Sequence, residues 1–351
     1  MNRNDPRRRK RSSLAPAALG ICVFAVTVGI GAGVLLSRPK ETPSEPALAP
    51  VNEISVTSAV TEMTTVPEMI TETVPEETEY QSGRPRRTEK TEEFKSSRVT
   101  SKYGLLVDAE SMEILATNKG SQRIYPASMT KVMTLLVAAE HLTDEDMDKK
   151  YTMSFDLLHP LVMENASRAG FDVDEEVTVK DMLYGLILPS GADAAIGLSE
   201  YVAGSEDKFV ELMNEKADEL GLKNTHFTNV TGLQDTNHYT TCSEMAMIMK
   251  AAMDDRLCRK VLSEYTYTTS STEQHPEGIV LYSTMFSRMY GNEVDGVDII
   301  AGKTGYTDEA GNCLVSYAEK NGKKYICVLA NAPDKWDAVY STFNAYADYL
   351  P

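Results

Sequence analysis

The stretch that decides the fold and the chemistry is YPASMTK at residues 125–131, followed by the apolar run VMTLLVAA at 132–139. Pro126 just ahead of such a run is typical of a helix start, so we expect Ser128 in the first turn of a core helix. Ser128 and Lys131 would then share one helix face. A serine is a weak nucleophile until an adjacent base takes its proton. Lysine can be that base only if desolvation or nearby cations lower its pKa, so we expect Lys131 to be enclosed.

The Ser-x-x-Lys pattern alone is weak evidence, because a chain of this length contains about one or two such pairs by chance. The sequence holds another, Ser205 and Lys208, which we interpret as a solvated helix start. Ser128 differs because two further motifs lie downstream of it, namely Ser-Gly at 190–191 and Lys-Thr-Gly at 303–305. A Lys-Thr-Gly triplet is expected by chance in about one chain in ten of this length.

This order of motifs resembles the penicillin-interacting serine acyltransferases, and the segments between the motifs resemble the D-alanyl-D-alanine carboxypeptidases. The matching stretches are YPASMTKVMT, DMLYGLILPSGADAA, ELGLKNTHFTNVTGL and GKTGYTDEAGNCLVSYA. The resemblance implies a serine-type carboxypeptidase that removes the terminal D-alanine from peptidoglycan stem peptides through an acyl-enzyme at Ser128. It also implies that β-lactams are covalent inhibitors, since they acylate the same serine.

The resemblance further implies roles for individual residues. The expected catalytic residues are Ser128 as nucleophile, Lys131 as its base, and Ser190, which bridges the lysines and passes a proton to the leaving D-alanine. The expected substrate-binding residues lie on an edge strand and are Lys303, Thr304, Gly305 and Tyr306. The Lys303 cation and the Thr304 hydroxyl would hold the terminal carboxylate of the substrate. Gly305 would allow the substrate to approach the strand closely. Backbone N–H groups of Ser128 and Tyr306 would stabilise the oxyanion. The alternatives are a capping serine at 128 and a loop serine at 190.

Two positions depart from the family pattern. The second motif usually ends in Asn, whose amide would bind the substrate and orient Lys131, but this chain has Ala192. Asn229 or Asn224 are candidates to compensate. Family members also often place a carboxylate-binding arginine just after the last strand, where this chain offers only Lys335 as a nearby cation. A lysine gives a point charge where arginine gives a fork.

Two other functions compete with the carboxypeptidase. A β-lactamase needs a group that activates water for deacylation, and no Glu-x-x-Leu-Asn-like segment lies between 190 and 303. A catalytically idle wall-binding protein with the same fold is favoured by Ala192 but disfavoured by the retained Ser128 and Lys131. A Ser-His-Asp triad lacks a Gly-x-Ser-x-Gly elbow, and we interpret His226 and His238 as structural. The Cys and His residues have no metal-ligand spacing, so no metal or other cofactor is expected.

The charge distribution and an apolar run suggest a membrane protein. The net charge of −17 excludes nucleic-acid binding by bulk charge. A basic cytoplasmic tail (1–13) precedes an apolar segment (14–37) that is long enough to span a bilayer once. We favour a retained anchor over a cleaved signal peptide. Residues 38–99 are rich in Thr, Glu and Pro and are expected to form a disordered stalk. The catalytic domain (100–351) would lie outside the cytoplasm at the bacterial cell membrane.

The expected fold class of residues 100–351 is α+β. Strands are predicted at 103–108, 112–116, 297–305, 313–318 and 324–329, and helices lie mostly between them. This pattern suggests an antiparallel sheet flanked by helices, with a helical subdomain, as in the β-lactamase/transpeptidase-like fold that the resemblance implies. Asn321-Gly322 predicts a two-residue hairpin turn that pairs Ser316 with Cys327. Four free, mostly buried thiols are expected outside the apolar segment. The extra C-terminal domain common in such carboxypeptidases is not expected after Pro351.

Overall fold

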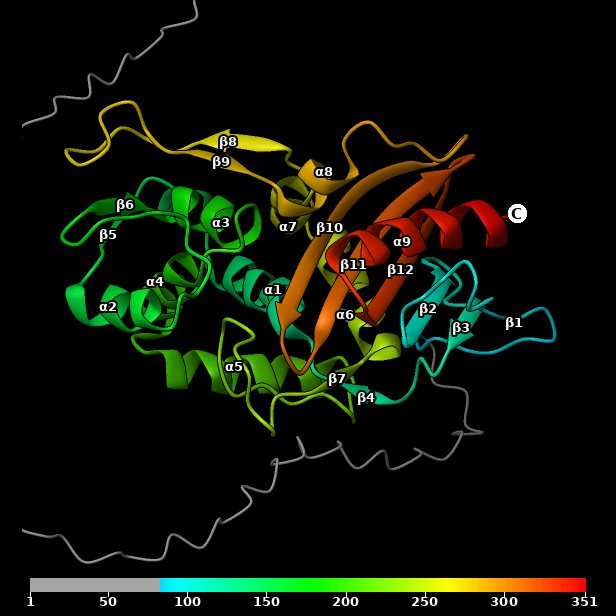
Figure 1. The fold of residues 1–351 in the computed structure, drawn as a ribbon. Helices are drawn as coiled ribbons and strands as arrows, with labels where there is room; N and C mark the ends of the chain where they lie inside the picture. Colours follow the sequence, from blue (N-terminus) through cyan, green and yellow to red (C-terminus); the bar gives the residue numbers. More distant parts are fainter. Residues whose placement is uncertain (1–82) are drawn as a thin grey trace, which may run out of the picture. The chain divides into compact units, whose positions relative to one another are not determined.

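The structure is a computed structural model that describes residues 83–351. Its centre is a six-stranded sheet with helices on both faces (Figure 1). In spatial order the strands are β1 (Glu92–Glu93), β3 (Ile114–Asn118), β2 (Tyr103–Asp108), β12 (Lys323–Ala332), β11 (Gly311–Lys320) and β10 (Asp298–Thr307). Neighbouring strands are antiparallel except β1 and β3, which are parallel. The predicted α+β class is therefore confirmed, with the short β1 as the one parallel addition among the described strands.

The helices are α1 (Lys131–His141), α2 (Phe155–Met163), α3 (Val179–Ile187), α4 (Ala192–Ala203), α5 (Glu206–Glu219), α6 (Cys242–Asp254), α7 (Arg256–Leu262), α8 (Thr284–Met289) and α9 (Lys335–Tyr349). Short 3₁₀ turns lie at Ala127–Thr130 and Asp144–Asp146. Three two-stranded ladders complete the fold: β4 (Arg123–Ile124) with β7 (Thr240–Thr241), β5 (Lys150–Thr152) with β6 (Glu176–Thr178), and β8 (Thr266–Thr268) with β9 (Val280–Tyr282).

The sheet is buried on both faces, and alternate residues of a strand enter different cores. Ile326 and Val328 of β12 belong to the large core shared with the helical region. Cys327 and Leu329 belong to a second cluster with Tyr346 of α9. Figure 1 shows α9 along one side of the sheet, while α6 packs against β2 and β12 from the other. This double coverage explains the nearly continuous apolar runs of β2, β11 and β12.

Helix α1 is the centre of the helical region. Every residue from Lys131 to Ala138 is buried, and α1 contacts α3, α4, α5, α6 and α7. A helix that is apolar all round must be enclosed in this way. Its N-terminal end lies at the edge strand β10, because the 3₁₀ turn before it packs on that strand. The site therefore forms where the central helix meets the sheet edge.

The hairpin of β11 and β12 has the predicted turn and register. Asn321 and Gly322 both have positive φ, 53° and 76°, as a two-residue type I′ turn requires. Ser316 pairs with Cys327. The four cysteines in the described part of the chain are free and buried, as expected.

The start of the described chain packs on the sheet. Strand β1 pairs with β3, and Phe94 and Val99 are buried in the cluster beneath α9. The Arg98 guanidinium also donates two hydrogen bonds, 2.8 and 3.0 Å, to the Asp348 carboxylate. The prediction that the stalk is disordered is therefore wrong for this last part, because a local Thr/Glu-rich composition hides two residues with a place in the core.

The predicted tail (1–13), the predicted membrane segment (14–37) and the first part of the predicted stalk lie outside the described residues. Among residues 83–351, no helix combines the length and apolar character needed to cross a bilayer.

Candidate active site

Ser128 and Lys131 lie on a tight turn at the start of the central helix. Ser128 belongs to the 3₁₀ turn, and Lys131 is the first residue of α1. We expected Ser128 in the first turn of the α-helix, but it lies in the 3₁₀ turn that precedes α1. The 3₁₀ turn favours the pairing, since residues three apart eclipse in it. Lys131 Nζ donates to Ser128 Oγ at 3.1 Å.

Lys131 is enclosed, as a basic lysine must be. Its side chain is 1 % exposed, and its Nζ donates a second hydrogen bond to the Thr231 carbonyl at 2.7 Å. Burial lowers the pKa of Lys131 to about 7, although the Asp193 charge opposes this shift. A large fraction of the amine is therefore neutral near pH 7 and able to accept a proton. An exposed helix lysine would instead stay protonated.

Asp193 is a buried carboxylate whose charge acts on Lys131. It accepts hydrogen bonds from the backbone N–H groups of Ala169 and Ala194, each at 2.8 Å, and of Gly170 at 3.1 Å. Burial raises its pKa, although these N–H groups favour the charged form. The bonds fix the loop at 169–170 against the start of α4, which comes just after Ser190.

Ser190 and Lys303 form a second hydroxyl–amine pair. Lys303 Nζ donates to Ser190 Oγ at 2.9 Å and to the Thr304 carbonyl at 2.7 Å. Ser190 sits in left-handed backbone, with φ of 66°, which turns its side chain into the site. Burial, followed by the charges of Lys131 and Arg288, holds the pKa of Lys303 well below its usual range. The amine that we expected to attract the substrate carboxylate as a cation is thus directed at Ser190.

The strand β10 brings the third motif against the nucleophile. A Cβ on Gly305 would lie 3.0 Å from the Ser128 nitrogen and from the Pro126 carbonyl oxygen, so the strand and the turn touch only because no side chain intervenes. The Thr304 and Thr284 hydroxyls lie 2.7 Å apart. The Tyr306 side chain is exposed and donates to Asp308, so only its backbone N–H is left as the group that we expect to contact the substrate.

The loop at 229–232 provides the carbonyl that accepts a hydrogen bond from Lys131. Asn229 was a candidate to compensate for Ala192, but the sequence did not predict this contact. The Asn229 side-chain oxygen accepts from the backbone N–H groups of Thr231 (3.1 Å) and Gly232 (2.7 Å), which presents the Thr231 carbonyl to Lys131. Gly232 has φ of 82°, and a Cβ there would lie 1.9 Å from the Ala127 carbonyl oxygen. Asn229 therefore contributes to orienting Lys131 indirectly, in a chain where Ala192 replaces the expected Asn.

His238 holds the 3₁₀ turn at Ala127–Thr130 through a hydrogen bond to Thr130. Its Nδ1 accepts the Thr228 backbone N–H at 3.1 Å, so Nε2 carries the proton and donates to Thr130 Oγ1 at 2.7 Å. Burial lowers the pKa of His238 to about 4, which keeps the ring neutral. The interpretation of His238 as structural agrees with these contacts, because its proton points to Thr130 and away from Ser128.

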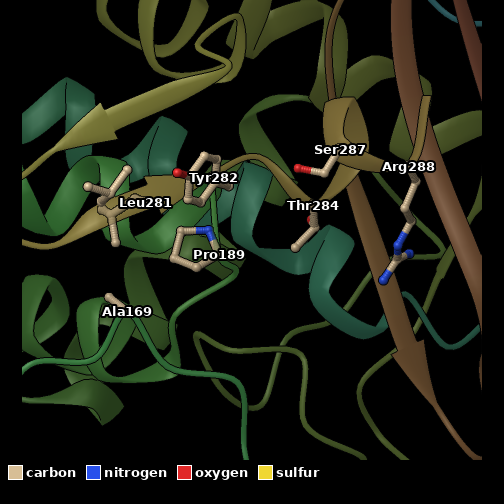
Figure 2. A pocket seen from close by; sticks show the side chains of 8 residues that line it. Ala169, Pro189, Leu281, Tyr282, Thr284, Ser287 and Arg288 are labelled. Carbon is tan, nitrogen blue, oxygen red and sulfur yellow. The ribbon is translucent and has the colours of Figure 1, made fainter. Parts of the chain in front are cut away.

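A cavity of about 390 Å³ opens beside these residues (Figure 2). Its lining residues are Ala169, Pro189, Val280, Leu281, Tyr282, Thr284, Ser287 and Arg288. Pro189 precedes Ser190 in the chain, and Thr284 bonds Thr304. The cavity therefore adjoins the second and third motifs without including the nucleophile.

A model of the D-alanyl-D-alanine carboxypeptidase family matches residues 88–334. This chain belongs to that family. The carboxypeptidase DacF of Bacillus subtilis (strain 168) is 36% identical over 234 residues, which span 66% of this chain and 57% of DacF. DacC of Escherichia coli (strain K12) is 32% identical over 245 residues, 67% of this chain and 57% of DacC. The chain thus spans a little over half the length of these curated relatives.

Solved carboxypeptidase-family folds resemble the structure as well. A variant of the Streptomyces K15 DD-transpeptidase has a TM-score of 0.64 and 28% identity, covering 72% of this chain and 99% of that one. Penicillin-binding protein 5 from Haemophilus influenzae has a TM-score of 0.62 and 29% identity, covering 70% and 69%. These matches agree with the sheet and helical region of residues 83–351.

Proposed function

We propose that this protein is a serine-type D-Ala-D-Ala carboxypeptidase acting on peptidoglycan stem peptides through an acyl-enzyme at Ser128. The observation that carries the proposal is the contact of Ser128 Oγ with a buried lysine whose pKa is about 7. Together they form a nucleophile with its base at neutral pH. The family membership of residues 88–334 supports the same chemistry.

In acylation, Lys131 takes the Ser128 proton as Oγ attacks the carbonyl carbon of the penultimate D-alanine. The backbone N–H groups of Ser128 and Tyr306 hold the oxyanion, and such donors lower the barrier by about 3 kcal/mol. Ser190, whose Oγ accepts a hydrogen bond from Lys303 Nζ, gives its proton to the departing nitrogen as the C–N bond breaks. The proton that Lys131 took from Ser128 is then passed to Ser190, so the Lys131 amine is neutral again. Free D-alanine leaves, and Ser128 carries the acyl group as an ester.

In deacylation, water attacks the ester carbonyl and gives a proton to the amine at Lys131. The bond from Oγ to the acyl carbon breaks, and Ser128 regains its proton. A β-lactam would enter the same sequence at its ring carbonyl. Its ring-opened amine stays attached after acylation, so the ester persists and the protein is inhibited.

The remaining parts of the proposal concern location. The segment 14–37 would anchor the chain in the bacterial cell membrane, with the catalytic domain on the extracytoplasmic side, where peptidoglycan lies. The apolar character of that segment and the basic residues before it support this placement.

The test is D-alanine release by the full-length protein from a stem peptide ending in D-Ala-D-Ala. Ser128→Ala should abolish release. Ser205→Ala is a matched control, because it alters the serine of the other Ser-x-x-Lys pair within residues 83–351. Release that persists in Ser128→Ala would exclude this nucleophile. Binding of the peptide without any release by the unaltered protein would favour the idle wall-binding protein, and rapid turnover of penicillin would favour the β-lactamase.

A further inference from the structure

The cavity beside the motifs has apolar walls and one cation. Pro189, Leu281 and Tyr282 are among the residues of the wall, and Arg288 of α8 supplies the charge (Figure 2). In this view Thr284 lies between Arg288 and Pro189. A few placed polar groups in a mostly apolar recess are typical of a small-molecule subsite.

Arg288 has no anionic partner within the described part of the chain. Within residues 83–351 its guanidinium has no hydrogen bond or ion pair, and burial alone moves its pKa, downward. A buried lysine can lose its charge, but an arginine keeps it. Arg288 is half-buried, and charges withdrawn from water are normally paired. Arg288 also lies close enough to Lys303 to lower the pKa of that lysine, so the local field is positive. The region therefore attracts an anion.

The other candidate cations are poorly placed for a substrate carboxylate. Lys303 directs its amine at Ser190 Oγ and the Thr304 carbonyl. Lys335, the nearby cation in the region where relatives often have an arginine, is exposed at the start of α9, with its amine 5.7 Å from the Trp336 ring centroid. Arg288 instead comes from a helix that packs on β10, the strand of the third motif.

The position of the cavity relative to the proton donor indicates which part of the substrate it faces. The leaving nitrogen must lie at Ser190 Oγ to receive its proton. The cavity begins at the preceding residue, Pro189, and at Thr284, whose hydroxyl contacts Thr304. The residue attached to that nitrogen is the one that is released. Its carboxylate is two bonds from the nitrogen, and its side chain branches from the same carbon.

We propose that Arg288 binds the terminal carboxylate of the residue that is released, and that the cavity beside it receives that residue's side chain. This inference rests on the proposed function. A volume of about 390 Å³ far exceeds a methyl group. The protein therefore releases apolar D-amino acids larger than D-alanine from the stem-peptide terminus, such as D-leucine or D-methionine.

The first experiment compares a stem peptide ending in D-Ala-D-Ala with its C-terminal amide, which lacks the anion. The full-length protein should prefer the carboxylate in kcat/KM. Arg288→Met should shrink that preference by roughly 10- to 100-fold, as expected for a charge-assisted hydrogen bond. Arg288→Lys should restore part of it. Arg256→Met is the matched control, since that side chain is 88% exposed on α7, and it should leave the preference unchanged.

The second experiment compares peptides ending in D-Ala-D-Leu and D-Ala-D-Ala. The unaltered protein should release D-leucine at a rate comparable to that of D-alanine. Ser287→Leu, which adds bulk to an exposed lining residue, should depress D-leucine release selectively. An unchanged carboxylate preference in Arg288→Met, or exclusion of D-leucine by the unaltered protein, would overturn the inference.

Failure of the proposed function has a different signature. No release from any peptide by the unaltered protein would contradict the carboxypeptidase. The inference would then be tested by acylation of Ser128 by a penicillin and by its methyl ester. If Arg288→Met left the ratio of those two acylation rates unchanged, or if neither compound acylated the protein, the inference would fail as well.

Discussion

Residues 83–351 hold two Ser-x-x-Lys pairs, and the structure places them in opposite environments. Ser128 lies in a turn held against β10, and its partner Lys131 is 1 % exposed. Ser205 caps α5 by accepting the Lys208 backbone N–H at 3.3 Å, and the Lys208 side chain is exposed. The spacing is identical, but only the first lysine is desolvated. The motif therefore places the lysine near the serine, whereas burial by segments far away in the chain lowers the pKa of the lysine and makes it a base.

The largest expected difference between the two pairs is in reactivity. Lys131→Met should slow acylation of Ser128 by a fluorescent penicillin by roughly a thousandfold, because the base is lost. Lys208→Met should change the rate by less than about twofold, as for most surface substitutions. Rapid acylation of Lys131→Met would show that another group accepts the serine proton.

Two glycines with the same backbone conformation sharpen the comparison. Gly232, beside the catalytic turn, has φ of 82°, and Gly204, beside Ser205, has φ of 81°. A Cβ at 232 would lie 1.9 Å from the Ala127 carbonyl oxygen, whereas nothing lies within 4 Å of one at 204. Gly204→Ala should cost about 1 kcal/mol from backbone strain alone. Gly232→Ala should cost more than about 3 kcal/mol of unfolding free energy, or lose acylation through displacement of the turn.

The thermal unfolding midpoints of the two variants, measured with the acylation rate of each, provide the check. Equal effects of the two substitutions on both readouts would mean that the contact of Gly232 with the turn is unimportant.

The pH dependence of acylation reports the burial of Lys131 directly. The amine acts as a base only when neutral, and burial lowers its pKa to about 7. Acylation should therefore rise about tenfold per pH unit below that value and level off above it. A lysine with the ordinary pKa of the free side chain would give a rate still rising toward about pH 10. The measurement is the acylation rate from pH 5 to 9, and a flat profile would contradict the assignment of Lys131 as the base.

The smallest effect concerns the second pair. Ser205→Ala removes the cap of α5 and should lower the unfolding free energy by about 1 kcal/mol, with acylation unchanged. Urea unfolding followed by circular dichroism would measure it. A loss of activity larger than the loss of stability would mean that α5 influences the site more than its cap contacts indicate.

Short sequence motifs predicted the four polar side chains at the centre of the site. The three motifs predicted Ser128, Lys131, Ser190 and Lys303, and the structure brings these four side chains together in two hydrogen-bonded pairs. Asn321-Gly322 predicted the hairpin register, since turn chemistry alone determines it.

The contacts that were missed join segments far apart in the chain. The Thr231 carbonyl reaches Lys131 across 100 positions, and His238 reaches Thr130 across 108. No periodicity or spacing marks such contacts. No sequence pattern marks Arg288, because its lack of an anionic partner within residues 83–351 can be seen only in the structure. Phe94 and Val99 were assigned to a stalk by composition, although both side chains are buried in the cluster that includes Tyr346 of α9.

The pairing of β2 with β12 has a consequence for how the domain forms. These strands come from opposite ends of the described chain, yet they are neighbours at the centre of the sheet. Closing so long a loop costs entropy before the ladder returns any stabilisation, and such non-local pairing makes folding slow. Until β12 has been synthesised, β2 lacks its main partner and the core cannot close. A catalytic domain that crosses a membrane with its N-terminal end first would thus remain unfolded until nearly all of it had crossed.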